Sequence, residues 1–415
     1  MALGRGPAEA QLRGHGGPIR ALAISPDGTT ALSGSFDTSA IRWSLDRNTA
    51  EQVLRFHEGA VNAVAILADG RAVTAGEDAR IALWTPGKQE PDGVLEGHEG
   101  PIVALAVSPD DTTLASASWD RTVRLWPLAG AAPRVLEGHQ QNVNGVAFMP
   151  DGTGVASVGY DGTLHIWLLH GRGSPLVAPL PSPLNAVAVA PHGEIIAAGA
   201  DGKVYFLSPA GDQREAIQAS STPITSLAIS RNGEFIAVAS MGGSVAIMDR
   251  RTHTLGRSFL GPGPPVWSVV FFPDNRTLFT GGTDRLIRRW DAETGRQIGT
   301  VDIGGPEDPL AAYAGDPGAQ VFRACVACHT LNPDQDNRAG PTLHGIFGRR
   351  IASLAGYNFS ETLKHLDIVW TPDTVARLFE IGPATYTPGT KMPEQRIGAP
   401  EDRAALVKFL ERATK

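Results

Sequence analysis

The stretch Ile19-Arg-Ala-Leu-Ala-Ile-Ser-Pro-Asp-Gly28 decides the fold of the larger part of the chain, because its pattern recurs. Ile102-Val-Ala-Leu-Ala-Val-Ser-Pro-Asp110 is a close copy. In both stretches small and branched apolar residues alternate with period two and end at a Pro-Asp turn. This is the chemistry of a strand followed by a tight turn. The sequence therefore predicts repeated antiparallel strands.

Polar and aromatic markers recur with the same period, near 41 residues. The recurring aspartates are Asp37, Asp78, Asp120, Asp161, Asp201 and Asp284. Six residues after five of them comes a tryptophan: Trp43, Trp84, Trp126, Trp167 and Trp290. A histidine leads the first four copies, at His15, His57, His98 and His139. Seven copies can be counted, starting near residues 14, 56, 97, 138, 179, 219 and 261. A period of this length predicts a repeat architecture.

These markers resemble the WD-repeat family, whose four-stranded blades close into a β-propeller. The resemblance implies seven blades over residues 1–301. It also implies a hydrogen-bonded tetrad of His, Ser or Thr, Asp and Trp in each complete blade. The implied tetrads are His15–Ser33–Asp37–Trp43, His57–Thr74–Asp78–Trp84, His98–Ser116–Asp120–Trp126 and His139–Ser157–Asp161–Trp167. A buried His–Asp pair resembles a catalytic pair, but its repetition at a fixed period in four copies favours a structural role.

The last three copies depart from this pattern. Copy five has Leu207 in place of Trp, and copy six has Gly242 and Met248 in place of Asp and Trp. Because strand periodicity survives, we expect these blades to form with weaker hydrogen bonding among their polar side chains. Either residues 9–12 or residues 296–301 could supply the outermost strand of the last blade. Family habit favours the N-terminal segment, which would close the ring and hide an edge.

Cys325-Val-Ala-Cys328-His329 holds the only two cysteines in the chain. A C-x-x-C-H run is typical of c-type haem attachment, in which two thiols bind the porphyrin and the histidine binds the iron. A structural zinc site would need four ligands, and no further cysteine exists. A thioredoxin-like dithiol would need a βαβ setting and would leave His329 without a role. The haem interpretation is therefore favoured.

The surrounding motifs extend this interpretation to a whole domain. Residues 302–315 are rich in Gly and Pro and are predicted to be a linker. A capped helix is predicted over 316–322 and an amphipathic helix over 401–410. Between the two helices lie the segments Gly340-Pro-Thr-Leu-His-Gly345 and Tyr386-Thr-Pro-Gly-Thr-Lys-Met392.

The order and spacing of these motifs resemble class I cytochrome c over residues 316–415. The resemblance implies one covalent haem c, attached through Cys325 and Cys328, with His329 and Met392 as the axial iron ligands. It further implies that the Pro341 carbonyl orients His329. It places Arg349, Tyr357 and Trp370 in the haem environment, and the Gly318 and Phe322 face against Leu406 and Phe409. The predicted fold is thus an all-β seven-bladed propeller followed by an all-α class I cytochrome c domain.

Composition limits the classes of function. The formal charge of −7 argues against a nucleic-acid partner. No stretch approaches the roughly 20 apolar residues of a transmembrane helix. Residues 310–415 carry 12 Lys and Arg and 11 Asp and Glu, whereas the rest carries 24 and 32. The first 17 residues lack the apolar core of a signal peptide. Since haem attachment takes place outside the cytoplasm in this family, we expect a mature periplasmic form with Met1 added for expression.

Two functional hypotheses follow. In the first, the protein transfers single electrons through a His/Met-ligated haem, and the propeller is a docking platform for a redox partner, which could also meet the exposed haem edge. In the second, the propeller binds a second cofactor or a substrate, as in quinohaemoproteins or some nitrite reductases, and passes electrons to the haem. The sequence favours the carrier over the enzyme, since filled axial positions suit electron transfer. A redox-sensing scaffold stays open, and the sequence leaves the oligomeric state unknown.

Overall fold

The structure is a computed structural model. It describes residues 11–169, 174–261, 265–299, 310–323, 325–327, 329–332, 340–355, 357, 359–390, 392 and 395–415. The chain divides into two compact units, one made chiefly of residues 17–300 and the other of residues 301–415. Each unit is described separately below.

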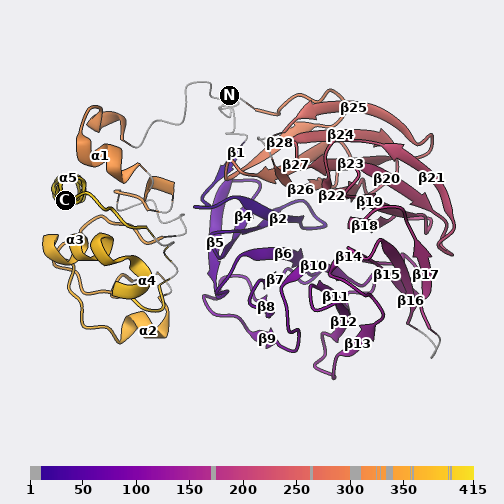
Figure 1. Ribbon diagram of the computed structural model, residues 1–415, viewed down its shortest axis with the longest axis horizontal. Coiled ribbons are helices and arrows are strands. Elements are labelled where there is room, and N and C mark those ends of the chain that lie inside the picture. The colour runs from indigo at the N-terminus through magenta and orange to yellow at the C-terminus, as the bar shows by residue number, and fades with distance from the viewer. Residues whose placement is uncertain are drawn as a thin grey trace, which may run out of the picture. The chain divides into compact units, whose positions relative to one another are not determined.

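The first unit is a ring of seven four-stranded antiparallel sheets, numbered here as blades 1 to 7 (Figure 1). Blade 1 is β2 (Ile19–Ile24), β3 (Thr30–Ser35), β4 (Ser39–Ser44) and β5 (Thr49–Arg55). Blade 2 is β6 (Val61–Ile66), β7 (Ala72–Gly76), β8 (Ile81–Trp84) and β9 (Gly93–Leu95). Blade 3 is β10 (Ile102–Val107), β11 (Thr113–Ser118), β12 (Thr122–Pro127) and β13 (Arg134–Glu137). Blade 4 is β14 (Val143–Phe148), β15 (Gly154–Gly159), β16 (Thr163–Leu168) and β17 (Leu176–Pro179). Blade 5 is β18 (Leu184–Val189), β19 (Ile195–Gly199), β20 (Lys203–Leu207) and β21 (Gln213–Gln218). Blade 6 is β22 (Ile224–Ile229), β23 (Phe235–Ser240), β24 (Ser244–Asp249) and β25 (Thr254–Leu260). Blade 7 is β26 (Val266–Phe271), β27 (Thr277–Gly282), β28 (Leu286–Asp291) and β1 (Gln11–Arg13).

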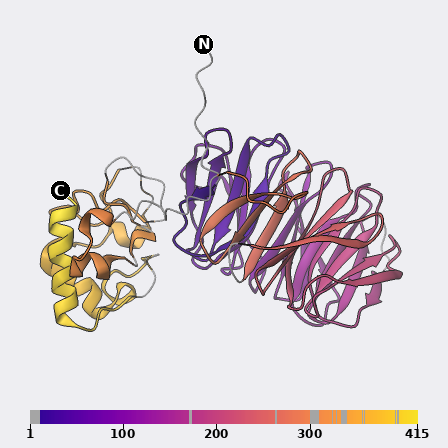
Figure 2. The ribbon, with the colours of Figure 1, turned by 90° about the horizontal axis from the view of Figure 1, so that it is seen from above.

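The predicted seven-bladed propeller is therefore confirmed. The first strand of each blade lies nearest the centre of the ring, and β2 contacts both β6 and β26, so the ring is continuous (Figure 1). Turned by 90°, the sheets are seen edge-on, one beside the next (Figure 2).

Tight turns connect the strands as the sequence indicates. Gly28 adopts a φ of +73°, in the left-handed region that favours glycine. A side chain there would also meet the ring of Phe272 at 2.7 Å. Glycine thus suits this turn for both its backbone conformation and the close approach of the neighbouring blade.

The hydrophobic core lies between the blades. One cluster joins Leu32 and Leu54 of blade 1 to Val61 and Trp84 of blade 2. Because each blade packs both of its faces against neighbouring blades, the inner strands β3 and β7 are buried throughout.

Both candidate segments contribute to ring closure. Gln11, Leu12 and Arg13 of β1 pair with Arg288, Ile287 and Leu286 of β28. At the other end of β28, Gln297 forms an antiparallel bridge with Trp290. The N-terminal segment supplies the outermost strand, as the resemblance favours. Gln297 of the C-terminal segment pairs with β28 beyond the end of that strand.

The second unit is helical and small. Its elements are η1 (Ala311–Tyr313), α1 (Pro317–Phe322), η2 (Cys325–Ala327), α2 (Glu361–Lys364), α3 (Pro372–Ile381), α4 (Pro383–Tyr386) and α5 (Pro400–Ala413). The predicted cap is confirmed, because the Asp316 carboxylate accepts from the Gly318 and Ala319 amides. None of the helices in the described ranges is long and apolar enough to cross a membrane.

Helix α1 crosses α5 at close range. A side chain on Gly318 would meet the Ala405 carbonyl oxygen at 2.1 Å, so only glycine fits there. Phe322 packs on Phe409 with ring centroids 5.4 Å apart. Together with Leu406 these aromatic residues belong to one buried cluster, which confirms the helix contact expected from the resemblance.

The domain limits 1–301, 302–315 and 316–415 stay predictions. Leu310, within the predicted linker, is 1% exposed and belongs to the core of the helical unit. Tyr313 packs edge-on against Phe409 at 5.0 Å. Of the predicted linker, residues 302–309 lie outside the described residues.

Candidate functional site

The Cys–His segment begins directly after α1. Cys325 starts the single turn η2, and the His329 amide donates to the Cys325 carbonyl at 2.9 Å. This hydrogen bond spans one helical turn and so brings the two residues to one side of the backbone. Cys325 is buried within the core cluster of the helical unit. Cys328, the second predicted attachment residue, lies outside the described residues.

The His329 ring is oriented by the segment that follows residue 340. Its Nδ1 lies 2.8 Å from the Pro341 carbonyl oxygen. A carbonyl can only accept, so Nδ1 carries the proton and Nε2 carries the lone pair. The Pro341 segment is itself anchored, because the Leu343 amide donates to the Thr330 carbonyl at 2.9 Å and the Thr342 hydroxyl donates to the Asn332 carbonyl at 2.9 Å.

Met392 lies in the segment between α4 and α5. Ser360 donates its hydroxyl to the Gly389 carbonyl at 2.8 Å, which ties this segment to the start of α2. Gly389 has a φ of +79°, and a side chain there would meet Thr362 at 2.7 Å. The Met392 amide donates to the Thr390 hydroxyl at 3.1 Å. The partly buried Met392 packs against the cluster that contains Cys325.

The three residues predicted for the haem environment occupy two places. Arg349 and Trp370 are neighbours, since the Trp370 amide donates to the Arg349 carbonyl at 2.9 Å. The Arg349 guanidinium donates to the Thr342 carbonyl at 2.8 Å, and burial lowers its pKa. Tyr357 packs its ring against that of Phe359 at 4.5 Å. Arg349 thus holds the backbone next to Pro341, a role that the sequence did not indicate.

The donor set fits a c-type haem. The Cys325 thiol belongs to an apolar cluster that the Met392 thioether borders. His329, whose Nδ1 is engaged by Pro341, is hydrogen-bonded through its backbone to Cys325. Thioether sulfur and imidazole are iron ligands of cytochromes c. An apolar shell limits the access of water to such a centre.

The propeller tetrads form as predicted in blades 2 to 4. In blade 3 the Nδ1 of His98 lies 2.6 Å from Asp120, its Nε2 lies 2.7 Å from Ser116, and Trp126 donates to Ser116 at 2.8 Å. In blade 2, burial opposes ionisation of Asp78, but the hydrogen bond and charge of His57 lower its pKa to about 2. The bonds repeat from blade to blade, so they are structural.

The incomplete blades use other polar contacts. In blade 5 the Tyr205 hydroxyl donates to Asp201 at 2.6 Å. In blade 7 Arg288 donates to Asp284 at 2.7 Å. Tyr205 and Arg288 each stand four residues after the aspartate of their blade. They therefore lie on the same face of the strand as the Trp position, which is two residues further along. Each of these two blades thus keeps a hydrogen bond to its aspartate, with a donor other than the histidine of the complete tetrads.

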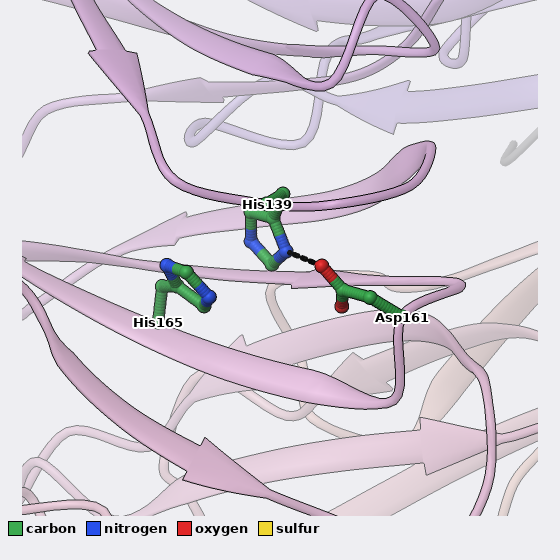
Figure 3. Close-up of side chains that lie close together, drawn as sticks. All are labelled: His139, Asp161 and His165. Atoms are coloured by element: carbon green, nitrogen blue, oxygen red, sulfur yellow. Dashed lines mark hydrogen bonds and ion pairs between the residues drawn. The ribbon is translucent and has the colours of Figure 1, made fainter.

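Blade 4 holds an additional histidine at the same position (Figure 3). His165 stacks on His139 with ring centroids 3.9 Å apart, and His139 Nδ1 lies 2.8 Å from Asp161. Among the described residues these three side chains are the only group of potential metal ligands close enough to share an ion. Both ring nitrogens of His139 are already engaged, by Asp161 at 2.8 Å and by Ser157 at 2.8 Å, as in the other complete tetrads. Burial, then the charge of His139, lower the pKa of His165 to about 4.

The comparisons with known proteins agree with both units. The family described as WD domain, G-beta repeat matches residues 6–44, 48–85, 89–127, 130–167, 211–249 and 253–291. The cytochrome c family matches residues 315–414. The chain therefore belongs to the WD-repeat family in its N-terminal part and to the cytochrome c family in its C-terminal part. The stretch between the fourth and fifth matches contains the first three strands of blade 5, which lacks both the leading His and the Trp.

Relatives of the C-terminal part are eukaryotic cytochromes c. Cytochrome c of Cochliobolus lunatus is 43% identical over 99 residues, which are 24% of this chain and 91% of the relative. Cytochrome c of Arabidopsis thaliana is also 43% identical over 99 residues, 24% of this chain and 88% of that protein. Cytochrome c type-1 of Ascaris suum is 37% identical over 113 residues, 26% of this chain and 96% of that protein. This relationship supports a covalently bound haem c that transfers electrons, beside a propeller suited to protein interactions.

Proposed function

We propose that this protein is a periplasmic electron carrier in which His329 and Met392 ligate the iron of a single haem c, while the propeller holds a redox partner. The observation that carries the proposal is the His329–Pro341 hydrogen bond at 2.8 Å, in a domain whose core Met392 borders. This bond sets the tautomer that a proximal ligand needs. The family relationship supports the electron-transfer part of the proposal.

When bound, the haem supplies a one-electron iron couple. The residues of the chain set its properties. The Pro341 carbonyl accepts a hydrogen bond from the Nδ1–H of His329 and so raises the basicity of Nε2. The thioether of Met392 would favour the reduced iron and raise the reduction potential. Cys325 and Cys328 would fix the haem covalently. Both axial positions would then be filled, which suits electron transfer.

The partner-holding role rests on the propeller. Its tetrad side chains hydrogen-bond one another and make the blades rigid. A rigid ring can present loops at fixed positions, which is how scaffolds usually carry binding residues. A partner docked there would meet the tethered haem at an effective concentration of roughly millimolar. Electron exchange with that partner would become almost intramolecular.

The periplasmic location is a further part of the proposal. It rests on the family's attachment of haem outside the cytoplasm, and the relatives named above do not bear on it. Fractionation of cells that produce the protein from its natural gene tests this point. Haem-stained protein in the periplasmic fraction supports it, and haem-stained protein confined to the cytoplasm overturns it.

Purified holoprotein tests the carrier role. We expect one haem per chain by the pyridine haemochrome assay, with no second cofactor. Reversible one-electron oxidation should be seen in a spectroelectrochemical cell. A second chromophore, or turnover of a substrate by the protein alone, would favour the enzyme hypothesis instead.

A further inference from the structure

The residue before the position of the tetrad aspartate, which is Gly242 in blade 6, is large, exposed and largely apolar in four blades. Phe36, Trp119, Tyr160 and Met241 are 40–44% exposed. In each of these four blades a hydrogen bond joins the entry loop to the turn that carries this residue: Gly17 to Asp37, His98 to Asp120, His139 to Asp161, and Gly242 to Thr222. All four side chains therefore lie at one end of the ring. Large apolar side chains repeated at one exposed position indicate an interaction site.

Arg20 and Trp267 lie at the same end, each as the second residue of an innermost strand. The register of the first strand pair shifts at this position in both blades. The Arg20 guanidinium lies over the Trp267 ring, 5.1 Å from its centroid, and the Phe36 ring lies 5.9 Å from it. The six residues Arg20, Phe36, Trp119, Tyr160, Met241 and Trp267 are called the tetrad face below.

Arg20 has no carboxylate partner in the described part of the chain. None of the ion pairs or side-chain hydrogen bonds found there includes it, and Tyr160, from across the ring, is the only titratable group that acts on its charge. A half-buried guanidinium with only an aromatic contact has lost hydration without gaining a counter-ion. The guanidinium group of an arginine is planar and can bind a carboxylate through two parallel hydrogen bonds, which makes arginine the side chain best suited to this contact.

The tetrad face is held in place by bonds between neighbouring blades. Trp119 donates its indole N–H to Asn144 at 3.1 Å. Asn144 in turn donates to the Leu184 carbonyl at 2.9 Å, and Asn185 donates to the Ile224 carbonyl at 2.8 Å. Because these side chains are already ordered in the free protein, binding of a ligand would cost less side-chain entropy there.

Charges on the same loops limit the ligand further. Glu58, Glu77 and Glu99 are exposed in the entry loops and turns of blades 2 and 3. A run of acidic residues would be repelled by these carboxylates. One carboxylate between apolar side chains would pair with Arg20 and cover the aromatic rings.

We propose that the tetrad face binds a partner protein through a segment that presents a single carboxylate side chain flanked by apolar side chains. This inference rests on the proposed function, since it assigns the propeller's partner-holding role to one face and one kind of ligand.

Selection of short random peptides displayed on phage tests it, with the full-length holoprotein as the target. We expect enrichment of peptides with one Asp or Glu between apolar or aromatic residues. Synthetic forms of these peptides should bind at least about tenfold more weakly when the acid is replaced by its amide, or when Arg20→Gln is the target. Trp267→Ala should also weaken binding, and added salt should weaken it for the wild type.

Arg276→Gln is the matched control. Arg276 is an exposed arginine between β26 and β27, at the opposite end of blade 7, and pairs with Asp291. It should bind the peptides as the wild type does. Arg20→Lys keeps the charge but loses the planar guanidinium, so it should bind with intermediate affinity.

Two results overturn the inference: enriched peptides without an acidic residue, or peptide affinity that Arg20→Gln leaves unchanged in a variant with wild-type circular dichroism. A library that yields no binding peptide also overturns it. The haem of the same samples separates this failure from that of the proposed function. Reversible one-electron cycling without peptide binding would reject only the docking face, whereas a haem that does not cycle would reject the carrier role.

Discussion

The Tyr205 hydroxyl donates a 2.6 Å hydrogen bond to the Asp201 carboxylate in blade 5, where the leading His and the Trp of the complete tetrads are missing. Tyr205 is 1% exposed, and burial together with the neighbouring carboxylate raises its pKa. The bond joins the second turn of the blade to its third strand, and the Asp201 amide donates to the Ser182 hydroxyl of the entry loop at 3.2 Å. The turn that carries Asp201 therefore stays hydrogen-bonded in a blade that has lost the leading His and the Trp.

Removing only that hydroxyl should destabilise the propeller. We expect Tyr205→Phe to lower the free energy of unfolding by about 1 kcal/mol, since one hydrogen bond to a partly solvated carboxylate is lost. Urea unfolding followed by tryptophan fluorescence measures this, because seven of the eight tryptophans lie in the propeller. Tyr160→Phe removes an exposed hydroxyl and should change stability by less than about 0.5 kcal/mol. Equal effects of the two variants would contradict the claim that the Tyr205–Asp201 hydrogen bond stabilises the propeller.

The buried His165 should make propeller stability depend on pH. Burial, then the charge of His139, lower its pKa from 6.5 to about 4. Between these values the unfolded chain binds a proton that the folded chain does not. The free energy of unfolding should therefore fall as pH drops from about 6.5 to 4, by up to about 3 kcal/mol, and this contribution should level off below pH 4.

His165→Ile tests this window, because blade 1 has Ile41 at the same register position. Urea unfolding at several pH values should show a flatter dependence for this variant than for the wild type. The exposed His192→Gln is the control and should keep the wild-type slope. A slope unchanged by His165→Ile would show that another group causes the dependence.

Closure of the ring should depend on Leu12. Its side chain is 1% exposed and packs in a cluster with Ile19, Trp43 and Phe279. We expect Leu12→Ala to cost about 2–4 kcal/mol of propeller stability, as for other buried leucines. Limited proteolysis should become faster as well. The neighbouring Gln11→Ala removes a partly exposed side chain, and a comparable loss there would argue that β1 acts through its backbone alone.

Arg349 should stabilise the helical unit. It donates to the Thr342 and His344 carbonyls, next to Pro341. Arg349→Ala should lower stability by about 2 kcal/mol, because hydrogen bonds from a charged donor are lost in a half-buried place. Unfolding followed by the Soret absorbance reports on this unit. The adjacent Arg350 is largely exposed and 3.9 Å from Asp367, so Arg350→Ala should cost less than about 0.5 kcal/mol. The opposite order would contradict the assignment.

Several features could be predicted from the sequence because they repeat. The period near 41 residues gave the number of blades, and four complete sets of markers located the tetrads. In the helical unit, Asp316 and Gly318 indicated a capped helix that packs closely, since each residue type has a specific physical use there.

Other features lacked a repeated signal. Tyr205, Arg288 and His165 all stand four residues after their aspartate, but their side chains differ, so no pattern linked them. Alternation along a strand, which puts such residues on one face, could have identified them. The division of ring closure between β1 and Gln297 depends on strand length, which sequence periodicity does not specify.

The ligation of the haem iron by Met392 is the most direct test of the electron-carrier account. It is measured by the far-red thioether-to-iron charge-transfer band and the reduction potential of the oxidised holoprotein. The wild type and the exposed control Met241→Ala should both show the band, while Met392→Ala should lose it and have a lower potential with its haem still covalently bound. A band and potential that Met392→Ala leaves unchanged would contradict the account.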